Sequence, residues 1–467
     1  MRAAVIGLLL LLSGCTACST GRSGSGSADA GSMGASDSQR LRERVSWPAP
    51  CPPDAGVGSR SVAPRSGVLR GDWIIVPGSP PTCPIYVAAS PSKYIPRLAW
   101  APCQSGRAGC LALAPDWTGA TSARILDFVG TEPVRIVNGT PMLVYQRNVP
   151  HASSFTQYDA YIGVVQPLGG EPVFAIGTDR PASGCQFVSA IGDDGIAVVI
   201  QAPRVTDAFV GVAPWCAPEG LEVTRQDGAA LGLSAGGFVQ YIAYASSRVF
   251  LELRSPNTID IFAPRSNTVR SADGASRAYA GFPVGAPGGA LVYDYTAPTG
   301  LGFVRADAGY EVLTKPAAGS QITAFSFDHS SSILVWAEAE ASEGSGVLRT
   351  TLWSSSYPNA TGRIVRRMVA RLNDKSVAGG LNMVANAGMV LNVLDDAMAL
   401  LTRVSDGQGW EVRPEAGTVF VRPVWVDDDE VWLSTATTSG ANPRAYPSGI
   451  VRVRRSELGS PTVPSGL

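Results

Sequence analysis

Only a few stretches of the chain combine the residue types that nucleophilic chemistry requires. Gly232–Gly236 reads Gly-Leu-Ser-Ala-Gly, a spacing that can expose a nucleophilic serine on a sharp turn between a strand and a helix. Asp294 or Asp328, followed by His329, would supply an acid and a base downstream of that serine. However, residues 237–243 have the pattern of a strand rather than a helix. We therefore interpret the stretch as a glycine-rich loop that leads into a strand.

Asp328, His329 and Ser330 place the three residue types of a catalytic triad side by side. Adjacent residues of a hairpin turn point in different directions, so this proximity in the sequence is no evidence for a triad. We expect His329 to be exposed in a turn. His151, the other of only two histidines, belongs to a polar loop. The sequence therefore assigns no catalytic residue.

Two acidic stretches could offer oxygen ligands to calcium, namely Asp193-Asp194 and Asp427–Glu430. Their spacing differs from the alternating pattern of a helix-loop-helix calcium loop, and we interpret them as solvated turn residues. A zinc site is disfavoured because the chain has no Cys-x-x-Cys pair and only two histidines. We expect neither a metal nor another cofactor.

The cysteines suggest disulfides rather than a metal site. The chain has eight cysteines, of which six remain once Cys15 and Cys18 near the amino terminus are set aside. An even number in an exported chain favours disulfides. We expect Cys103–Cys110 to clamp one hairpin, and we choose Cys51–Cys83 and Cys185–Cys216 from the roughly 15 possible connectivities.

The first 14 residues have the features of a secretory signal. Arg2 is followed by the apolar run Ala3–Leu12, which is too short to span a bilayer. The run ends in Leu-Ser-Gly-Cys15, which resembles the lipobox of bacterial lipoproteins. In that family the signal is cut before the cysteine, which then carries a diacylglyceryl thioether and usually an N-acyl chain such as palmitate. The alternative is an ordinary secretion signal with an incidental cysteine.

The lipobox resemblance implies a location and an anchor. Acyl chains on Cys15 would hold the protein in a lipid bilayer. Thr16 stands where an aspartate favours retention in the inner membrane of some bacteria, so we expect an outer-membrane lipoprotein of the cell envelope. Residues 15–45 are mostly Gly, Ser, Ala and Thr and predict a disordered, flexible tether. Residues 46–467 form the remaining domain, which begins with an irregular, proline-rich lead-in.

Strand and turn signals then recur to the end of the chain. Ala190–Ile200 shows the unit: an apolar strand, an acidic turn with glycine, and a second apolar run of β-branched residues. Successive turns of this kind are mostly about 40 to 55 residues apart, the spacing of a four-stranded propeller blade. The turns lie near residues 106, 139, 194, 246, 287, 330, 387 and 428.

This pattern resembles β-propellers of the WD40-like and TolB-like kind, over about residues 68–456, in period and strand order only. It implies an all-β fold with a single propeller of seven blades, or eight as the alternative. We expect Gly449–Arg454 to close the ring by sharing a sheet with strands from residues 68–90. Two β-sandwich domains would also fit the strand signals.

One segment departs from the strand pattern. Ile364, Val365, Met368, Val369 and Leu372 are spaced as on one face of a helix, with arginines between them. The segment is either a short amphipathic helix, which could touch anionic lipid, or an irregular outer strand.

Charge and composition restrict the function. The net charge of −1 provides no field that would attract nucleic acid. With an anchor, a tether and a rigid scaffold but no usable catalytic set, the sequence favours a non-catalytic scaffold that binds a protein or glycan partner. The alternative is a propeller hydrolase or lyase that acts on glycan or peptide, which would need carboxylates from several blades to converge in the central channel.

Overall fold

The computed structural model describes the chain between residues 69 and 462, apart from a set of loops. The described residues are 69, 73–88, 98–101, 110–113, 128–129, 135–137, 140–150, 158–167, 174–179, 186–192, 195–201, 206–214, 220–233, 237–254, 258–264, 268–271, 280–295, 298–341, 348–357, 364–373, 377, 382–394, 398–437 and 449–462. Apart from the 3₁₀ helix η4 (Arg455–Glu457), their regular structure consists of strands. None of the helices in these segments has the length and apolar character that a membrane crossing requires.

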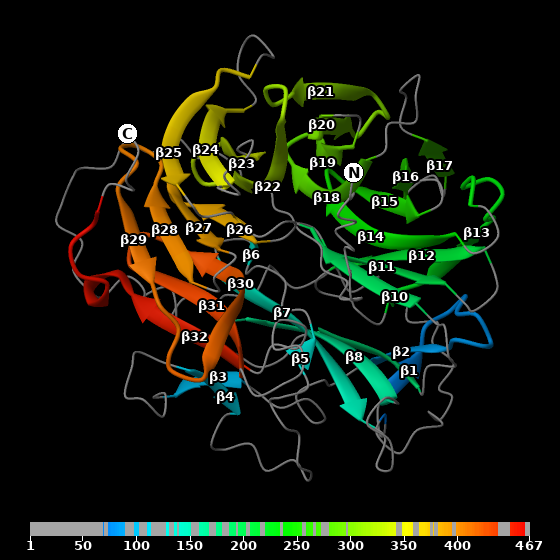
Figure 1. The fold of residues 1–467 in the computed structure, drawn as a ribbon. Helices are drawn as coiled ribbons and strands as arrows, with labels where there is room; N and C mark the ends of the chain where they lie inside the picture. Colours follow the sequence, from blue (N-terminus) through cyan, green and yellow to red (C-terminus); the bar gives the residue numbers. More distant parts are fainter. Residues whose placement is uncertain are drawn as a thin grey trace, which may run out of the picture.

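The strands form seven antiparallel sheets arranged around a common centre (Figure 1). Five sheets contain four strands each, in chain order from the centre outward. Their strands are β10 (Gln186–Ile191), β11 (Gly195–Gln201), β12 (Ala208–Pro214), β13 (Val223–Gln226); β14 (Phe238–Ala245), β15 (Arg248–Arg254), β16 (Thr258–Ala263), β17 (Thr268–Ser271); β18 (Ala280–Ala286), β19 (Gly289–Asp294), β20 (Gly300–Arg305), β21 (Tyr310–Thr314); β22 (Ser320–Asp328), β23 (Ile333–Ala341), β24 (Leu348–Ser356), β25 (Arg367–Asn373); and β26 (Met383–Asn386), β27 (Met389–Val393), β28 (Ala399–Arg403), β29 (Gly409–Val412).

The other two sheets combine strands from distant parts of the chain. One has the order β1-β2-β9-β8-β7-β5, with β6 also paired to β7, and the other has the order β3-β4-β32-β31-β30. Their strands are β1 (Trp73–Ile75), β2 (Ile85–Ala88), β5 (Phe128–Val129), β6 (Arg135–Val137), β7 (Thr140–Pro150), β8 (Tyr158–Pro167), β9 (Phe174–Asp179); and β3 (Leu98–Ala101), β4 (Cys110–Leu113), β30 (Thr418–Val426), β31 (Glu430–Thr437), β32 (Gly449–Arg454). We call the sheet that contains β7 blade 1, the five regular sheets blades 2 to 6, and the sheet that contains β30 blade 7.

Successive blades share their hydrophobic cores. One buried cluster joins blades 1 and 2, another joins blades 2 and 3, and four more continue this series to blades 6 and 7. Each of blades 1 to 6 thus packs face to face with the blade that follows it. The fold is a seven-bladed β-propeller. This arrangement confirms the single all-β ring and rules out two separate sandwiches, in which each sheet would pack against one partner only.

Strand β11 shows why its sequence is apolar at successive positions. Ile196, Val198 and Ile200 pack into the core shared with blade 1, whereas Ala197 and Val199 pack into the core shared with blade 3. Side chains of a strand point alternately to opposite faces. Because a neighbouring sheet covers each face, both sets of side chains are apolar, and the strand reads as a continuous hydrophobic run.

The ring closes through different strands from those we expected. β32 does enter a sheet with amino-terminal strands, but its partner is β4, where Val451 lies opposite Cys110. The strands from residues 68–90 join blade 1 instead, where β2 pairs with β9. All four residues of β2 (Ile85–Ala88) are buried, so this strand needs cover on both faces. In its outer position in blade 1, β2 packs Ile85 and Val87 into the core shared with blade 2.

The hairpin β1–β2 also binds the outer strand of blade 2. Val76, Ile85 and Val87 belong to the core shared by blades 1 and 2, and the Val223 amide donates a 3.0 Å hydrogen bond to the Pro77 carbonyl. Gly78 follows with a positive φ of 78°, and a Cβ there would collide with the Val223 carbonyl oxygen. Glycine is therefore required at this contact.

The segment with helical spacing is a strand. Residues 367–373 form β25, the outer strand of blade 5, in register with β24. Val369, Ala370 and Leu372 are buried, whereas Val365 and Met368 are exposed. The irregular outer strand was therefore the correct alternative, because pairing with β24 satisfies the backbone and decides the conformation.

We predict that Gly78→Ala lowers the free energy of unfolding by about 2–5 kcal/mol, because it adds steric overlap to the cost of a positive φ. Gly319→Ala is a matched control, since Gly319 has a φ of 87° and open space around the position of a Cβ. Gly319→Ala should lower the free energy of unfolding by only about 1–2 kcal/mol. Denaturant unfolding measures both values, and equal losses would show that the hairpin does not depend on close approach to Val223.

Candidate interaction surface at the hairpin turns

The turns that connect the first and second strands of the blades lie on one side of the ring, together with those that connect the third and fourth strands. We call this side the turn face. Its described turns comprise residues 246–247, 287–288, 329–332, 387–388 and 427–429 between first and second strands, and 306–309 and 404–408 between third and fourth strands. Hydrogen bonds between neighbouring turns join several blades on this face.

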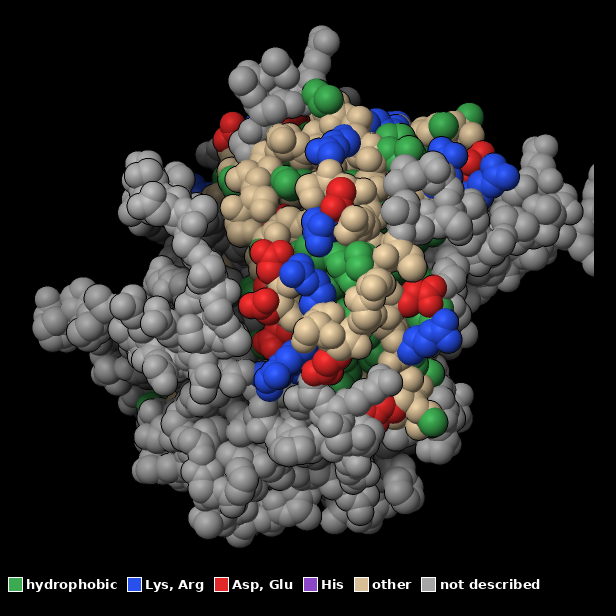
Figure 2. Space-filling view, turned by 90° about the vertical axis from the view of Figure 1, so that its left-hand side faces the viewer, with side chains coloured by type: hydrophobic (Ala, Val, Ile, Leu, Met, Phe, Trp, Pro, Cys, Tyr) green, Lys and Arg blue, Asp and Glu red, His purple; other side chains and the backbone are tan. Residues whose placement is uncertain are grey.

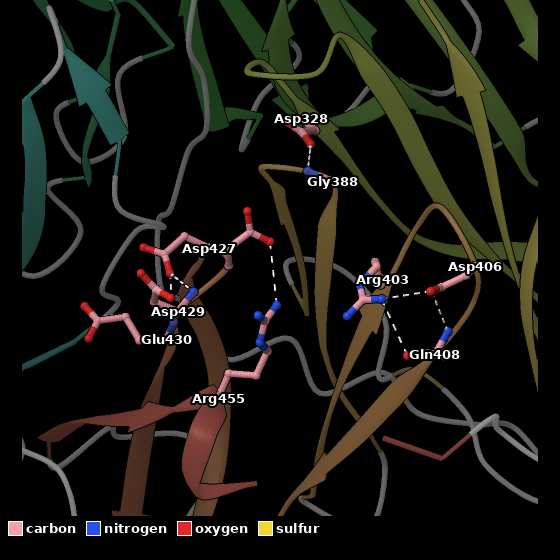
Figure 3. Close-up of polar contacts among 10 residues, drawn as sticks. Asp328, Gly388, Arg403, Asp406, Gln408, Asp427, Asp429, Glu430 and Arg455 are labelled. Atoms are coloured by element: carbon pink, nitrogen blue, oxygen red, sulfur yellow. Dashed lines mark hydrogen bonds and ion pairs between the residues drawn. The ribbon is translucent and has the colours of Figure 1, made fainter. Parts of the chain in front are cut away.

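Asp328 makes the most extensive of these connections (Figure 3). Its side chain is 1% exposed. One carboxylate oxygen accepts hydrogen bonds from the Ser330 amide at 3.0 Å, the Ser331 amide at 3.0 Å and the Ser330 hydroxyl at 2.7 Å. The other accepts a 2.7 Å bond from the Gly388 amide of blade 6. Asp328 thus shapes its own turn and binds the next one.

The Asp-His-Ser stretch is structural in this arrangement. The Ser330 hydroxyl, which donates to Asp328, also accepts a 2.8 Å hydrogen bond from the Ala387 amide. His329 was expected to be exposed, but it is half-buried and packs edge-on against Phe327, with ring centroids 4.5 Å apart. The aromatic contact explains the difference. The serine and the aspartate therefore bind each other and the neighbouring turn.

Further polar contacts join other blades on the same face. The Gly288 amide of blade 4 donates a 3.2 Å bond to the Ser246 hydroxyl of blade 3. The Asn386 side-chain amide of blade 6 donates a 3.0 Å bond to the Val426 carbonyl of blade 7. These bonds connect the ends of neighbouring blades, where the apolar cores stop, and hold the turns in a defined arrangement.

In the acidic turn of blade 7, one carboxylate accepts hydrogen bonds within the turn and another is exposed to solvent (Figure 3). Asp427 accepts bonds from the Asp429 and Glu430 amides, both at 2.8 Å, and from the Trp425 indole at 3.1 Å. The Asp428 side chain is 71% exposed and lies 3.7 Å from Arg455. In the described segments, no three His, Cys, Asp or Glu side chains lie together as metal ligands would.

Two turns between third and fourth strands share a pattern that the sequence analysis missed. In blade 4, Asp307 accepts a hydrogen bond from Gly309 and pairs with Arg305 at 3.1 Å. In blade 6, Asp406 accepts one from the Gln408 amide and pairs with Arg403 at 2.8 Å. The hydrogen bond from the backbone amide is the largest cause that lowers the pKa of each carboxyl group. The hydrogen bond and the positive charge of the paired arginine lower the pKa further. An arginine two or three residues before an aspartate is the signal that could have revealed these turns.

Buried acids of blades 4 and 5 are matched by cations. Asp294 is 1% exposed and lies 3.1 Å from the Lys315 ammonium. Glu338 binds Arg366 at 2.5 Å and accepts a 2.9 Å bond from the Trp336 indole. The Arg366 guanidinium also stacks over the Trp353 ring, 4.3 Å from its centroid. These two carboxylates therefore belong to ion pairs that connect strands.

The lateral surface carries both signs of charge. Figure 2 shows the side of the ring where β25, β28 and β29 lie, and there acidic and basic side chains are interspersed. Glu411 of β29 forms an exposed ion pair with Arg413, which follows the strand, at an N–O distance of 3.0 Å. This part of the described surface has no large patch of one charge.

Several residues singled out in the sequence lie outside the described part of the chain. They are Cys15, Cys51, Cys103, Cys185, Cys216, His151, Asp193-Asp194 and Ser234. Cys83 is described and is 2% exposed, while the side chains of the other cysteines are not described. Cys110 begins β4, opposite Ala101 of β3, so a hairpin exists at the place where Cys103–Cys110 was expected. The three pairings stay predictions.

The chain is similar to known proteins in structure but not in sequence. No family model matches the sequence, and no curated protein matches it. Among solved structures, the computationally designed Ika8 protein is 10% identical over 85% of this chain and 100% of that chain, with a TM-score of 0.43. An oligogalacturonate lyase in complex with manganese is 10% identical over 71% and 97%, with a TM-score of 0.43. The β-propeller domain of the Trilobed protease from Pyrococcus furiosus is 12% identical over 74% and 97%, with a TM-score of 0.41.

We predict that Asp328→Ala lowers the free energy of unfolding by about 2–5 kcal/mol, because it removes a buried carboxylate that accepts four hydrogen bonds from two turns. Asp406→Ala removes a turn carboxylate of the same kind from an exposed position and should cost about 1 kcal/mol or less. Urea unfolding of both variants tests the difference. If the two losses were the same, Asp328 would contribute no more than a surface turn residue.

Proposed function

We propose that the protein is a lipid-anchored, non-catalytic binding scaffold of the bacterial cell envelope that receives a protein or glycan partner on its turn face. The observation that carries this proposal is the set of hydrogen bonds between neighbouring turns, above all Asp328 to the Gly388 amide at 2.7 Å. Loops held rigidly on a scaffold bind partners with a smaller loss of conformational entropy. The exposed side chain of Asp428 adds polar contacts at the same face.

The anchor is the second part of the proposal. Cys15 would carry the acyl chains, and residues 15–45 would separate the propeller from the membrane. The propeller would then reach partners at a distance from the bilayer surface. An outer-membrane location follows from Thr16 in the position after the lipidated cysteine. Disulfides Cys103–Cys110, Cys51–Cys83 and Cys185–Cys216 would suit this oxidising compartment.

The alternative of a propeller hydrolase or lyase lacks a specific supporting observation in the described residues. It would need carboxylates that converge in the channel and remain free for chemistry. The buried carboxylates of Asp294 and Glu338 are instead occupied by Lys315 and Arg366. We therefore do not propose that activity.

We predict that Cys15→Ala moves the full-length protein from the membrane fraction to the soluble fraction, because the acyl chains would be lost. Cys18→Ala, three residues away, is the matched control and should remain with the membrane. Fractionation followed by immunodetection of the propeller measures the distribution. An unchanged distribution of Cys15→Ala would refute the anchor and leave the scaffold hypothesis to be tested separately.

The scaffold hypothesis predicts that a partner contacts the turn face rather than the opposite side. A photo-crosslinking amino acid at Asp428 should give a discrete adduct in intact cells. Glu340 is exposed near the far end of β23 and provides a control position on the opposite side. Adducts from Glu340 but not from Asp428, or from neither position, would contradict the proposed face.

A further inference from the structure

A cavity on the turn face lies between blades 3 and 4. Its volume is about 410 Å³, within the range of small-molecule sites. Blade 3 contributes the start of β15, the end of β16 and the start of β17, and blade 4 contributes the turn between β20 and β21. The lining residues are Arg248, Ile261, Ala263, Thr268, Ala306, Asp307 and Ala308.

The walls of the cavity are mostly small and apolar. Ile261 and Ala308 are 3% and 4% exposed and belong to the core shared by blades 3 and 4. Ala263 and Ala306 add methyl groups at half-exposed positions. Such walls can accommodate a short aliphatic group without burying a polar one.

Arg248 is the one cation among the lining residues. It follows a turn in which Ser246 and Ser247 have positive φ values of 50° and 55°. The Ser246 hydroxyl holds this turn against blade 4 by accepting the Gly288 amide at 3.2 Å. The Arg248 guanidinium donates a 2.9 Å bond to the Ser247 carbonyl, and none of the ion pairs among the described residues includes it. Its other N–H donors remain available to a ligand.

The lining also contains an acid whose charge is already offset. Asp307 pairs with Arg305 at 3.1 Å and accepts the Gly309 amide at 3.0 Å, and its side chain is 72% exposed. The cavity therefore has one uncommitted positive group and one neutralised negative group. A ligand with several negative charges would meet only one free guanidinium, so the cavity suits a ligand with a single negative charge.

We propose that this cavity binds a carboxylate-bearing ligand of one or two amino-acid residues, either a free amino acid or the end of a peptide chain. Arg248 would hold the carboxylate through a bidentate contact, which suits the planar guanidinium. Ile261 and the alanines would surround a short side chain. The proposal rests on the turn face being a binding surface but does not depend on the lipid anchor.

Calorimetric titration of the full-length protein in detergent tests the proposal with three probes: acetyl-Ala-Ala with a free carboxylate, the same peptide as its carboxamide, and free alanine. The free-carboxylate peptide or alanine should bind, and the carboxamide should bind at least tenfold more weakly. Binding of the peptide alone identifies a chain end, and binding of alanine identifies a free amino acid. Equal binding of peptide and carboxamide, or no binding of any probe, would overturn the proposal.

Two variants assign the binding to this cavity. Arg248→Gln should weaken binding of the carboxylate at least tenfold, whereas Arg254→Gln, at the other end of β15, should leave it unchanged. Ala306→Phe should block the cavity without altering its charge. Thermal unfolding of each variant checks that the propeller is folded. Undiminished affinity in Arg248→Gln and Ala306→Phe would place the ligand elsewhere, while cross-linking at Asp428 would still report on the scaffold function.

Discussion

The sheets of blades 2 to 6 each have two apolar faces, and a neighbouring sheet buries each of them. β11 illustrates the constraint, since Ile196 and Ala197, adjacent in sequence, belong to cores on opposite sides of blade 2. A row of such sheets that did not close would leave an apolar face exposed at each end. Closure by β4 on β32 and by β2 on β9 is therefore part of the stability of the whole ring.

Beyond the ends of the apolar cores, hydrogen bonds between polar groups connect neighbouring blades. Strand ends leave backbone N–H groups that need acceptors, and Asp328 and Ser246 supply them from the neighbouring blade. The same bonds determine where functional groups lie on the turn face. The turn that Ser246 holds against Gly288 is the one that presents Arg248 to the cavity between blades 3 and 4. In the proposed function, stability and recognition would thus depend on the same contacts.

Much of the fold was predictable because strand and turn chemistry is local. Apolar strand runs and the spacing of turns favoured a single ring of seven blades over eight blades or two sandwiches, and the structure has seven. The strand β25 was only one of two alternatives, because its apolar residues also fit a helical period. His329 was misjudged because its burial depends on contact with the Phe327 ring. The arginine–aspartate turns at Arg305 and Arg403 had a local signal that was overlooked.

By itself, the sequence determined the class of fold and the positions of most turns and favoured seven blades over eight, since these depend on hydrophobic period and turn residues within a few tens of positions. The tertiary structure alone decided which amino-terminal hairpin closes which blade, because any free strand edge can accept a strand and only the surrounding cores select among them. It also decided that Arg248, Ile261 and Ala306 share one cavity. Residues far apart in the chain meet there only when two sheets pack face to face.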